Sequence, residues 1–239
     1  MRILLPPSET KDLGGSHPSL TEKPIVDSLS LARSEVIEAL LELCDDADTA
    51  AKALKLGPKQ LVDVDRNLEL LSSPAMPAIE RYTGVLFDAL KADGLPSSDQ
   101  LMIQSSLFGL IPASTAIPYY RLSWDSKLPG MNLKRHWQLA HEGFFDGFDL
   151  VLDMRSKSYQ QLAPIESENS YVVEVLVEYP DGSKKPLNHF NKKAKGVFAK
   201  QAANAQISSI DQVFEIAAQA GQRAELGENS LTLIVPEGY

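Results

Sequence analysis

The chain has 239 residues, of which 44% are hydrophobic and 23% charged. This composition is typical of a folded globular protein and excludes a disordered or fibrous chain. The net charge of −9 also excludes indiscriminate nucleic-acid binding over the whole surface, so any contact with a polyanion must lie in a local groove.

The hydrophobic pattern predicts strands and helices that alternate along the whole chain. Strands are expected at short apolar runs, at Arg2 to Leu5, Leu101 to Gln104, Leu150 to Met154, Tyr171 to Tyr179 and Leu231 to Val235. Helices are expected at Ser28 to Cys44, Lys59 to Leu71, Ala75 to Leu90, Leu133 to Glu142, Ser156 to Ala163, Asn191 to Ile207 and Ile210 to Ala220. A turn at Pro180 to Gly182 makes the fourth strand one arm of an antiparallel element. We therefore predict a mixed α/β (α+β-like) fold, a single domain over residues 1–239 with a mixed sheet flanked by helices.

The N-terminus and the single cysteine bear on the compartment. Met1 to Leu5 is too short for the apolar core of a signal peptide, and no apolar run approaches the roughly 20 residues needed to cross a bilayer. Cys44 lies on the apolar side of a helical pattern, where it is either a core residue or a redox-sensing thiol. We expect a cytoplasmic protein with no membrane partner.

Hydroxyl-bearing segments follow three of the predicted strands. Ser8 and Glu9 come after the first strand and the stiff Pro6-Pro7 pair, Ser105 after the second, and Ser156 after the third. If these strands are parallel neighbours, their carboxyl ends line one edge of the sheet, where ligands of open α/β sheets bind. Each segment read alone is equally a helix cap or a loop start.

The strongest charge contrast lies between Lys184 and Ile210, which hold six lysines and no acid, so that the rest of the chain carries −15. On a helical projection Lys192, Lys193 and Lys195 lie opposite the apolar side. This face either offers cations to an anion or is an ordinary solvated helix face.

Two further segments have the composition of a nucleic-acid contact. The irregular stretch Leu107 to Leu128 combines Tyr120 with Arg121, a pair suited to stacking a base or sugar and holding a phosphate, or to packing as a surface loop. Ala53 to Leu61 contains a Leu-Gly-Pro-Lys turn, a loose form of the helix-hairpin-helix turn. Six acids between Glu35 and Asp48 favour an ordinary turn between two helices instead.

The chain lacks the standard catalytic motifs, including the Walker loop, the Gly-x-Ser-x-Gly elbow and the dinucleotide fingerprint. His136 and His141 do not share a helix face, and no histidine has the spacing of a metal site. We therefore expect neither a metal nor a cofactor.

Six blocks in order resemble the YaaA family, also called DUF328 or UPF0246, whose members are described as peroxide stress response proteins. The blocks are Leu5 to Lys11, Arg81 to Leu90, Ser105 to Leu110, Ile117 to Leu122, Lys127 to Gly130 with Ser156 to Tyr159, and Asn191 to Gly196. The chain departs from the family pattern at Asn188 to Phe190, and Lys195 replaces an arginine. The resemblance implies a YaaA-type fold with a basic cleft, DNA binding in some members, and a role in limiting free iron and Fenton damage during peroxide stress.

Three functions remain open. The first is nonspecific DNA binding, with anion contacts at Ser8, Lys11, Ser105, Tyr120, Arg121, Ser156, Lys157, Tyr159, Lys192, Lys193 and Lys195, and with Tyr120 and Tyr159 as stacking partners. The second is an enzyme acting on a small anionic ligand, nucleotide- or carboxylate-like, at the same cleft, with Glu9 as acid or base and Lys157 or Lys193 as the reactive amine. The third is iron binding by carboxylates such as Glu9 and Asp88. The first two require that the scattered cations surround one concave pocket.

Overall fold

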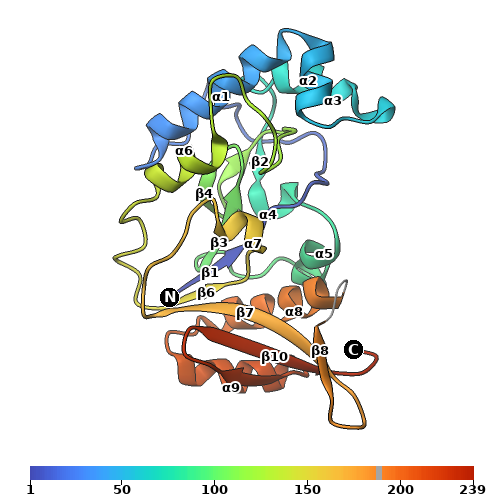
Figure 1. Ribbon diagram of the computed structural model, residues 1–239, viewed down its shortest axis with the longest axis vertical. Helices are drawn as coiled ribbons and strands as arrows, with labels where there is room; N and C mark the ends of the chain where they lie inside the picture. Colours follow the sequence, from blue (N-terminus) through green and yellow to red (C-terminus); the bar gives the residue numbers. More distant parts are fainter. Residues whose placement is uncertain (187–189) are drawn as a thin grey trace.

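The computed structural model describes residues 1–186 and 190–239 (Figure 1). The departure noted at Asn188 and His189 lies outside these residues. The strands are β1 Arg2–Leu5, β2 Met76–Pro77, β3 Leu101–Ser105, β4 Gly109–Pro112, β5 Ala116–Ile117, β6 Val151–Asp153, β7 Ser170–Glu178, β8 Lys184–Pro186, β9 Arg223–Leu226 and β10 Ser230–Pro236. The helices are α1 Ser30–Cys44, α2 Ala47–Ala53, α3 Val62–Leu68, α4 Ala78–Arg81, α5 Val85–Lys91, α6 Leu133–Ala140, α7 Lys157–Gln160, α8 Phe190–Ala205 and α9 Ile210–Gln219, with a 3₁₀ turn η1 at Pro58–Gln60.

The main sheet has eight strands in the order β4-β3-β1-β6-β7-β10-β9, and β8 pairs with β7 beside this path. The five central strands of this order, β3, β1, β6, β7 and β10, are parallel to one another. The strands β4, β8 and β9 pair antiparallel with their neighbours. Parallel strands are covered on both faces and are therefore continuously apolar, as β1 is, with Ile3, Leu4 and Leu5 fully buried. The predicted mixed α/β fold with a sheet flanked by helices is confirmed.

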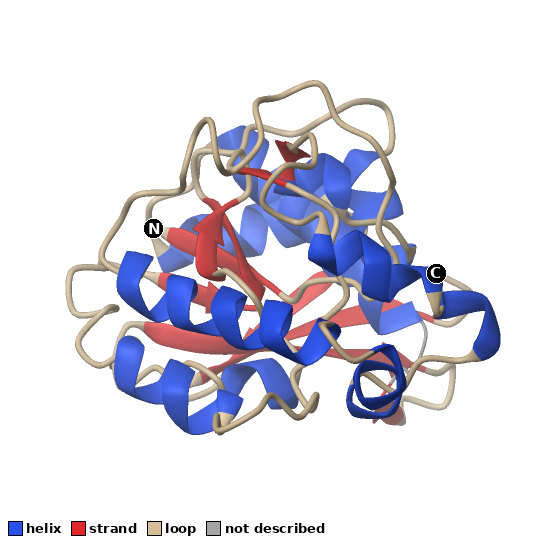
Figure 2. Cartoon of the chain, turned by 90° about the horizontal axis from the view of Figure 1, so that it is seen from above, coloured by secondary structure: helices blue, strands red, loops and turns tan. Residues whose placement is uncertain are grey.

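Helices cover both faces of the sheet. The strands run between two groups of helices when the molecule is seen from above (Figure 2). The helices α1, α2, α3 and α6 gather at one end of the molecule and α8 and α9 at the other (Figure 1). Helix α8 packs against α5, α9 and β7. Within the described residues, no helix combines the length and the apolar character needed to span a membrane.

The expected helix from Ala75 to Leu90 is wrong, because the chain forms β2, α4 and α5 there. Tyr82 makes an antiparallel bridge with Lys11, and the Thr83 amide donates to the Thr10 carbonyl at 3.2 Å. Gly84 then adopts a φ of +97°, which a side chain would strain. Pairing with the N-terminal loop thus interrupts a segment whose apolar spacing is helical.

The fourth predicted strand is also more central than expected. It is β7, which does form an antiparallel pair with β8 but also lies between β6 and β10 in parallel pairing. The predicted helix at Lys59 to Leu71 is shorter, because it begins as η1 and continues as α3 only to Leu68.

The contact between α5 and α8 depends on Gly196. A methyl group at this position would lie 2.3 Å from the Leu86 carbonyl oxygen and 2.9 Å from the Ala89 Cβ. Both distances are far below ordinary van der Waals contact, so the two helices approach as closely as they do because residue 196 has no side chain.

We expect Gly196→Ala to lower the free energy of unfolding by about 1 to 3 kcal/mol, since the overpacked helices must separate. This loss opposes the roughly 0.5 to 1 kcal/mol by which alanine favours a helix over glycine. Urea unfolding followed by circular dichroism measures the difference. Gly147→Ala is the control, because a methyl group there meets no atom within 4 Å. A G196A variant as stable as the wild type would show that α5 and α8 can separate without loss.

Candidate functional site

The carboxyl ends of three parallel strands meet at one edge of the sheet. β1 lies between β3 and β6, with Leu5 opposite Ile103 and Leu4 opposite Asp153. The loops that leave these strands therefore start side by side. The strands are thus the parallel neighbours on which the expected convergence of the segments after Leu5, Gln104 and Met154 depended, although β3 extends to Ser105 and β6 ends at Asp153.

A buried ion pair fixes this edge. The Arg155 guanidinium donates to both carboxylate oxygens of Asp153, at 2.9 and 2.8 Å, and to the Gln104 amide oxygen at 3.1 Å. Its fourth contact is the Ala163 carbonyl at 2.9 Å. Because Arg155 is only 2% exposed, this fork connects β3, β6 and the segment after α7 with little interference from solvent.

The N-terminal loop is held by a second buried arginine. Arg81 donates to the carbonyls of Asp12, Gly14 and Ile117, the last two at 2.7 and 3.1 Å. Burial lowers the pKa of Arg81 to about 10, which leaves the guanidinium charged at neutral pH. The loop after β1 therefore has a defined path although it contains no regular structure from Pro6 to Thr10.

A cavity of about 500 Å³ opens beside this loop. Hydroxyl groups line much of it, from Ser8, Thr10, Thr83, Ser123, Ser156 and Tyr159, together with Glu9, Lys192, Trp124 and the apolar residues Pro6, Pro7, Val85, Leu86 and Phe87. Trp124 is 39% exposed, so part of its ring is accessible to a ligand. We call this space the Glu9 cavity.

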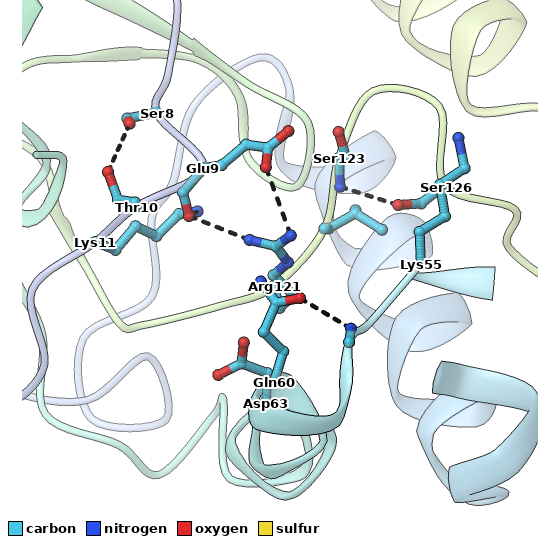
Figure 3. Close-up of polar contacts among 12 residues, drawn as sticks. Ser8, Glu9, Thr10, Lys11, Lys55, Gln60, Asp63, Arg121, Ser123 and Ser126 are labelled. Atoms are coloured by element: carbon cyan, nitrogen blue, oxygen red, sulfur yellow. Dashed lines mark hydrogen bonds and ion pairs between the residues drawn. The ribbon is translucent and has the colours of Figure 1, made fainter. Parts of the chain in front are cut away.

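Arg121 contacts the residue that gives the Glu9 cavity its name, although it does not itself line the cavity. Its guanidinium contacts the Glu9 carboxylate at 3.5 Å and the Glu9 carbonyl at 3.4 Å (Figure 3). The side chain of Asn67 on α3 holds the backbone of Arg121, accepting from its N–H at 2.8 Å and donating to its carbonyl at 2.9 Å. The side chain of Arg121 is 14% exposed and that of Glu9 is 71% exposed. Arg121 is therefore rigidly placed, while its carboxylate partner is free to move.

Lys11 lies beside the same carbonyl, on a platform of two tyrosine rings. Its amine donates to the Glu9 carbonyl at 3.3 Å and lies 4.4 Å from the centre of the Tyr120 ring and 5.5 Å from that of Tyr82. Burial and the positive charge of Arg121 lower the pKa of Lys11 to about 7, although Glu9 and Asp63 act in the opposite direction. The tyrosine faces also favour the charged form.

A chain of hydrogen-bonded hydroxyl groups holds the two tyrosine rings in place. The Tyr120 hydroxyl lies 2.7 Å from that of Tyr82 and 2.8 Å from Ser105 Oγ. Tyr120 is only 1% exposed and its ring is covered by Lys11, which contradicts its expected role as a stacking partner for a base. Ser105 is likewise fully buried, so it supports the site without reaching a ligand.

The other predicted cations do not all reach the Glu9 cavity. Lys192 lines it, as do Ser156 and Tyr159, but Lys157 lines a separate cavity of about 660 Å³ together with Arg155 and Asn229. The Lys193 amine lies 5.3 Å from the centre of the Tyr239 ring.

Lys195 has a packing role. It is 9% exposed, and its amine donates to the Met154 carbonyl at 3.3 Å. Burial lowers the pKa of Lys195 to about 8, opposed by Asp153 and Glu174. The expected phosphate contact of Lys195 is therefore not compatible with its place under the end of β6.

The turn between α2 and α3 has the geometry of an ordinary helical hairpin. The Gly57 amide, which a phosphate would need, already donates to the Gln60 side chain at 3.0 Å. Asp63 and Asp65 lie in the first turn of α3, where they would repel a phosphate. Lys55 pairs with Asp125, so the turn is also tied to the segment that follows Arg121.

The residues described contain no group of three or more histidine, cysteine, aspartate or glutamate side chains placed to hold a metal ion. The iron-binding hypothesis based on Glu9 and Asp88 therefore gains no support from the geometry. Cys44 is buried and contacts the Asn67 amide at 3.7 Å, and burial raises the pKa of its thiol. Its position is that of a core residue.

Comparison with known proteins connects this site to a family. The family model described as "Peroxide stress protein YaaA" matches residues 1–222. The chain belongs to the YaaA family. UPF0246 proteins of Corynebacterium glutamicum (strain R) and Corynebacterium efficiens are 40% and 38% identical to it, each over 98% of this chain and 100% of the relative. A UPF0246 protein of Streptomyces coelicolor is 36% identical over 82% of this chain and 80% of its own length.

The sequence blocks that resemble the YaaA family surround the Glu9 cavity. Pro6 to Thr10, Thr83 to Phe87, Ser156 with Tyr159, and Lys192 belong to four such blocks and line it. Sequence reasoning missed Thr83, Gly84 and Trp124 as site residues. The signal for the first two was the Tyr82-Thr83-Gly84 block, which was read as part of a helix, whereas nothing in the sequence distinguishes Trp124 from a surface residue.

We expect Ser105→Ala to lower the free energy of unfolding by about 1 to 3 kcal/mol, since buried groups lose their partner. The Ser105 hydroxyl accepts from the amides of Leu107 and Phe108, both at 3.0 Å, in addition to its contact with Tyr120. Chemical unfolding of the variant measures the loss, with Ser114→Ala as an exposed control expected to change stability by less than about 0.5 kcal/mol. Equal effects of the two substitutions would argue that the hydroxyl chain contributes nothing to the platform.

Proposed function

We propose that this protein acts in the response to hydrogen peroxide in the cytoplasm and binds DNA nonspecifically through the basic surface around the Glu9 cavity. The family description supports the first part of the proposal. The second part is supported by one observation above all. Three cations come from segments far apart in the chain and meet near one cavity in a protein whose net charge is −9: Lys192 lines the cavity, and Lys11 and Arg121 contact Glu9, which also lines it.

The lining of the cavity suits a sugar–phosphate backbone. Cations attract phosphates without reading sequence, and hydroxyls such as Ser8, Thr10 and Ser156 are common donors to phosphate oxygens. Tyr120 is buried, but Trp124 is partly exposed and could take over the stacking role. Any base has a flat face that can stack on the Trp124 ring. The expected DNA contact is therefore one of charge, hydroxyls and stacking.

Binding along DNA also provides a rationale for protection against Fenton chemistry. Hydroxyl radicals react where they form, and a protein that occupies phosphates displaces the cations condensed there, iron among them. We propose that the protein also helps to limit free intracellular iron, and with it Fenton damage, during peroxide stress. Survival of a deletion strain in hydrogen peroxide, with free iron measured by electron paramagnetic resonance, tests the role. Full survival and unchanged free iron in that strain would refute it.

We expect Lys192→Gln to weaken DNA binding and to reduce the slope of log affinity against log salt by about 0.9, the value for one lost phosphate contact. Fluorescence anisotropy with a labelled duplex over a range of salt concentrations measures both quantities. Lys193→Gln is the matched control, because it removes the same charge from the next residue of the same helix, which faces Tyr239. The proposed surface is wrong if the two variants lose the same slope, or if wild-type binding is insensitive to salt.

We expect DNA affinity to rise as the pH falls from 8 to 6, because Lys11, with a pKa of about 7, gains its positive charge over this range. The groups that face this amine are Glu9, Asp63, Arg81, Arg121, Tyr82 and Tyr120. Burial raises the pKa of both tyrosines and that of Arg81 remains near 10, so these three do not change charge in the window. Lys11→Met should remove this part of the pH dependence. An unchanged pH profile in K11M would assign the effect to another group.

A second candidate function is an enzyme that acts on a small anionic ligand at the same cavity. The observation that favours it is the enclosed, hydroxyl-lined space next to a lysine amine that is partly neutral at pH 7. Glu9 remains the candidate acid or base. Lys157 and Lys193 were the expected reactive amines, but they lie outside the cavity, and Lys11 takes their place in this proposal.

A further inference from the structure

The side chain of Lys11 has the surroundings of a reactive amine. The ion pairs formed among residues 1–186 and 190–239 do not include Lys11, and its polar contact is a carbonyl oxygen, Glu9 O at 3.3 Å. Tyr82 and Tyr120 enclose it from one side and Arg121 repels its proton from another. A lysine on an open surface has none of these features.

The protonation state follows from these surroundings. Because the pKa of Lys11 is lowered to about 7, close to half of the molecules carry a neutral amine at neutral pH, compared with less than about one in a thousand for an ordinary lysine with a pKa near 10.4. Only the neutral amine has a lone pair with which to attack an electrophile. The shift therefore increases the reactive population by about a thousandfold.

The cavity next to this amine defines what the electrophile looks like. Its volume of about 500 Å³ lies in the range of small-molecule sites, roughly 300 to 1,000 Å³. Hydroxyls of Ser8, Thr10, Thr83, Ser123 and Ser156 offer hydrogen bonds to a polyhydroxylated compound, and Lys192 offers charge to a phosphate, with Arg121 close by as the ion-pair partner of Glu9. A sugar phosphate has both kinds of group. Glu9 and Thr10, the lining residues next to Lys11, are close to its amine in the chain, and the amine contacts the Glu9 carbonyl at 3.3 Å, so the amine lies directly behind the lining at Glu9.

We propose that Lys11 forms an imine with the aldehyde of a sugar phosphate held in the Glu9 cavity. The sugar phosphate is either a free molecule or the ring-opened sugar at an abasic position of DNA, which carries the same aldehyde and phosphate. The inference rests on the second candidate function, the small anionic ligand, and gives that ligand a chemical class.

The reaction needs no oxidant or reductant. The Lys11 lone pair forms a C–N bond to the carbonyl carbon, the carbonyl π electrons move to oxygen, and that oxygen takes a proton to give a carbinolamine. The nitrogen lone pair then forms the C=N bond as the hydroxyl group takes a second proton and leaves as water, while the nitrogen loses the two protons it carried as an amine. Tyr159 lines the cavity and, because burial raises its pKa, keeps a hydroxyl proton to donate to the departing oxygen.

Reductive trapping tests the proposal. The full-length protein is incubated at pH 7.5 with 2-deoxyribose 5-phosphate, with 2-deoxyribose, or with a duplex that contains one abasic site, and sodium borohydride then reduces any imine to a stable secondary amine. Peptide mass spectrometry locates the adduct in the wild type without any substitution. Lys11→Arg keeps the charge but cannot form the imine, and Lys195→Arg is the matched control at the other buried lysine.

We expect an adduct on the peptide that contains Lys11, its loss in K11R, its retention in K195R, and a weaker adduct with 2-deoxyribose, which has no phosphate. An adduct in the free sugar phosphate arm alone identifies a metabolite, and one in the DNA arm alone identifies an abasic site. Adducts spread over surface lysines, an adduct that persists in K11R, or no adduct in either phosphate arm would overturn the proposal. Salt-dependent binding of undamaged DNA, measured separately on wild type and K11R, shows whether the DNA-binding proposal fails independently.

Discussion

The parallel pairing of β3, β1 and β6 is the constraint on which the rest of the site depends. Three strands that run in the same direction must end at the same edge, and the loops that follow them have to share the space beyond it. The Arg155 fork to Asp153 and Gln104 holds two of the three ends together in the dry interior. The loop after β1 and the segment after β6, which both line the Glu9 cavity, start at this edge.

The N-terminal loop is the second determinant, because it shapes a distant part of the chain as well as itself. The loop pairs with residues 81–83 and so interrupts a helix. This pairing brings the Arg81 guanidinium to carbonyls of the loop and places the Tyr82 ring next to the Lys11 amine. Helix α5 restarts only after Gly84, and the space left by the interruption becomes the cavity wall formed by Thr83 to Phe87. Local propensity is overridden here by tertiary pairing.

These two determinants explain how much the sequence could reveal. The central strands were predictable because they are short apolar runs with abrupt ends, and their convergence followed from the rule for parallel sheets. The break at Tyr82 was not predictable, since Ile79, Tyr82, Leu86 and Leu90 keep a helical spacing and the partner that breaks it lies some 70 positions away. The difference between Lys192 and Lys193 was also hidden, because adjacent residues on a helix point about 100° apart and only the neighbours decide which direction is the cavity.

The reactivity of the lysines depends still more on context. Lys11 is one lysine among many in the sequence, and its place between Arg121 and two tyrosine rings combines three separate segments, around residues 11, 82 and 120. Tyr120 and Arg121 have the composition of a recognition pair, but the Tyr120 side chain is buried in a chain of hydroxyl groups, whereas the Arg121 side chain pairs with Glu9. Patterns of residue type could locate the region, whereas the roles within it depend on burial.

The contact between Glu9 and Arg121 has a consequence for the anionic ligands proposed above. Since the guanidinium already holds a carboxylate, a visiting monoanion only exchanges one negative partner for another, and the net electrostatic gain is small. A ligand with two or more negative groups, or a polymer that repeats them, could bind Lys192 with one group and replace the Glu9 carboxylate at Arg121 with another. Because Glu9 competes for Arg121, the number of negative groups on a ligand should matter more for its affinity than its total charge.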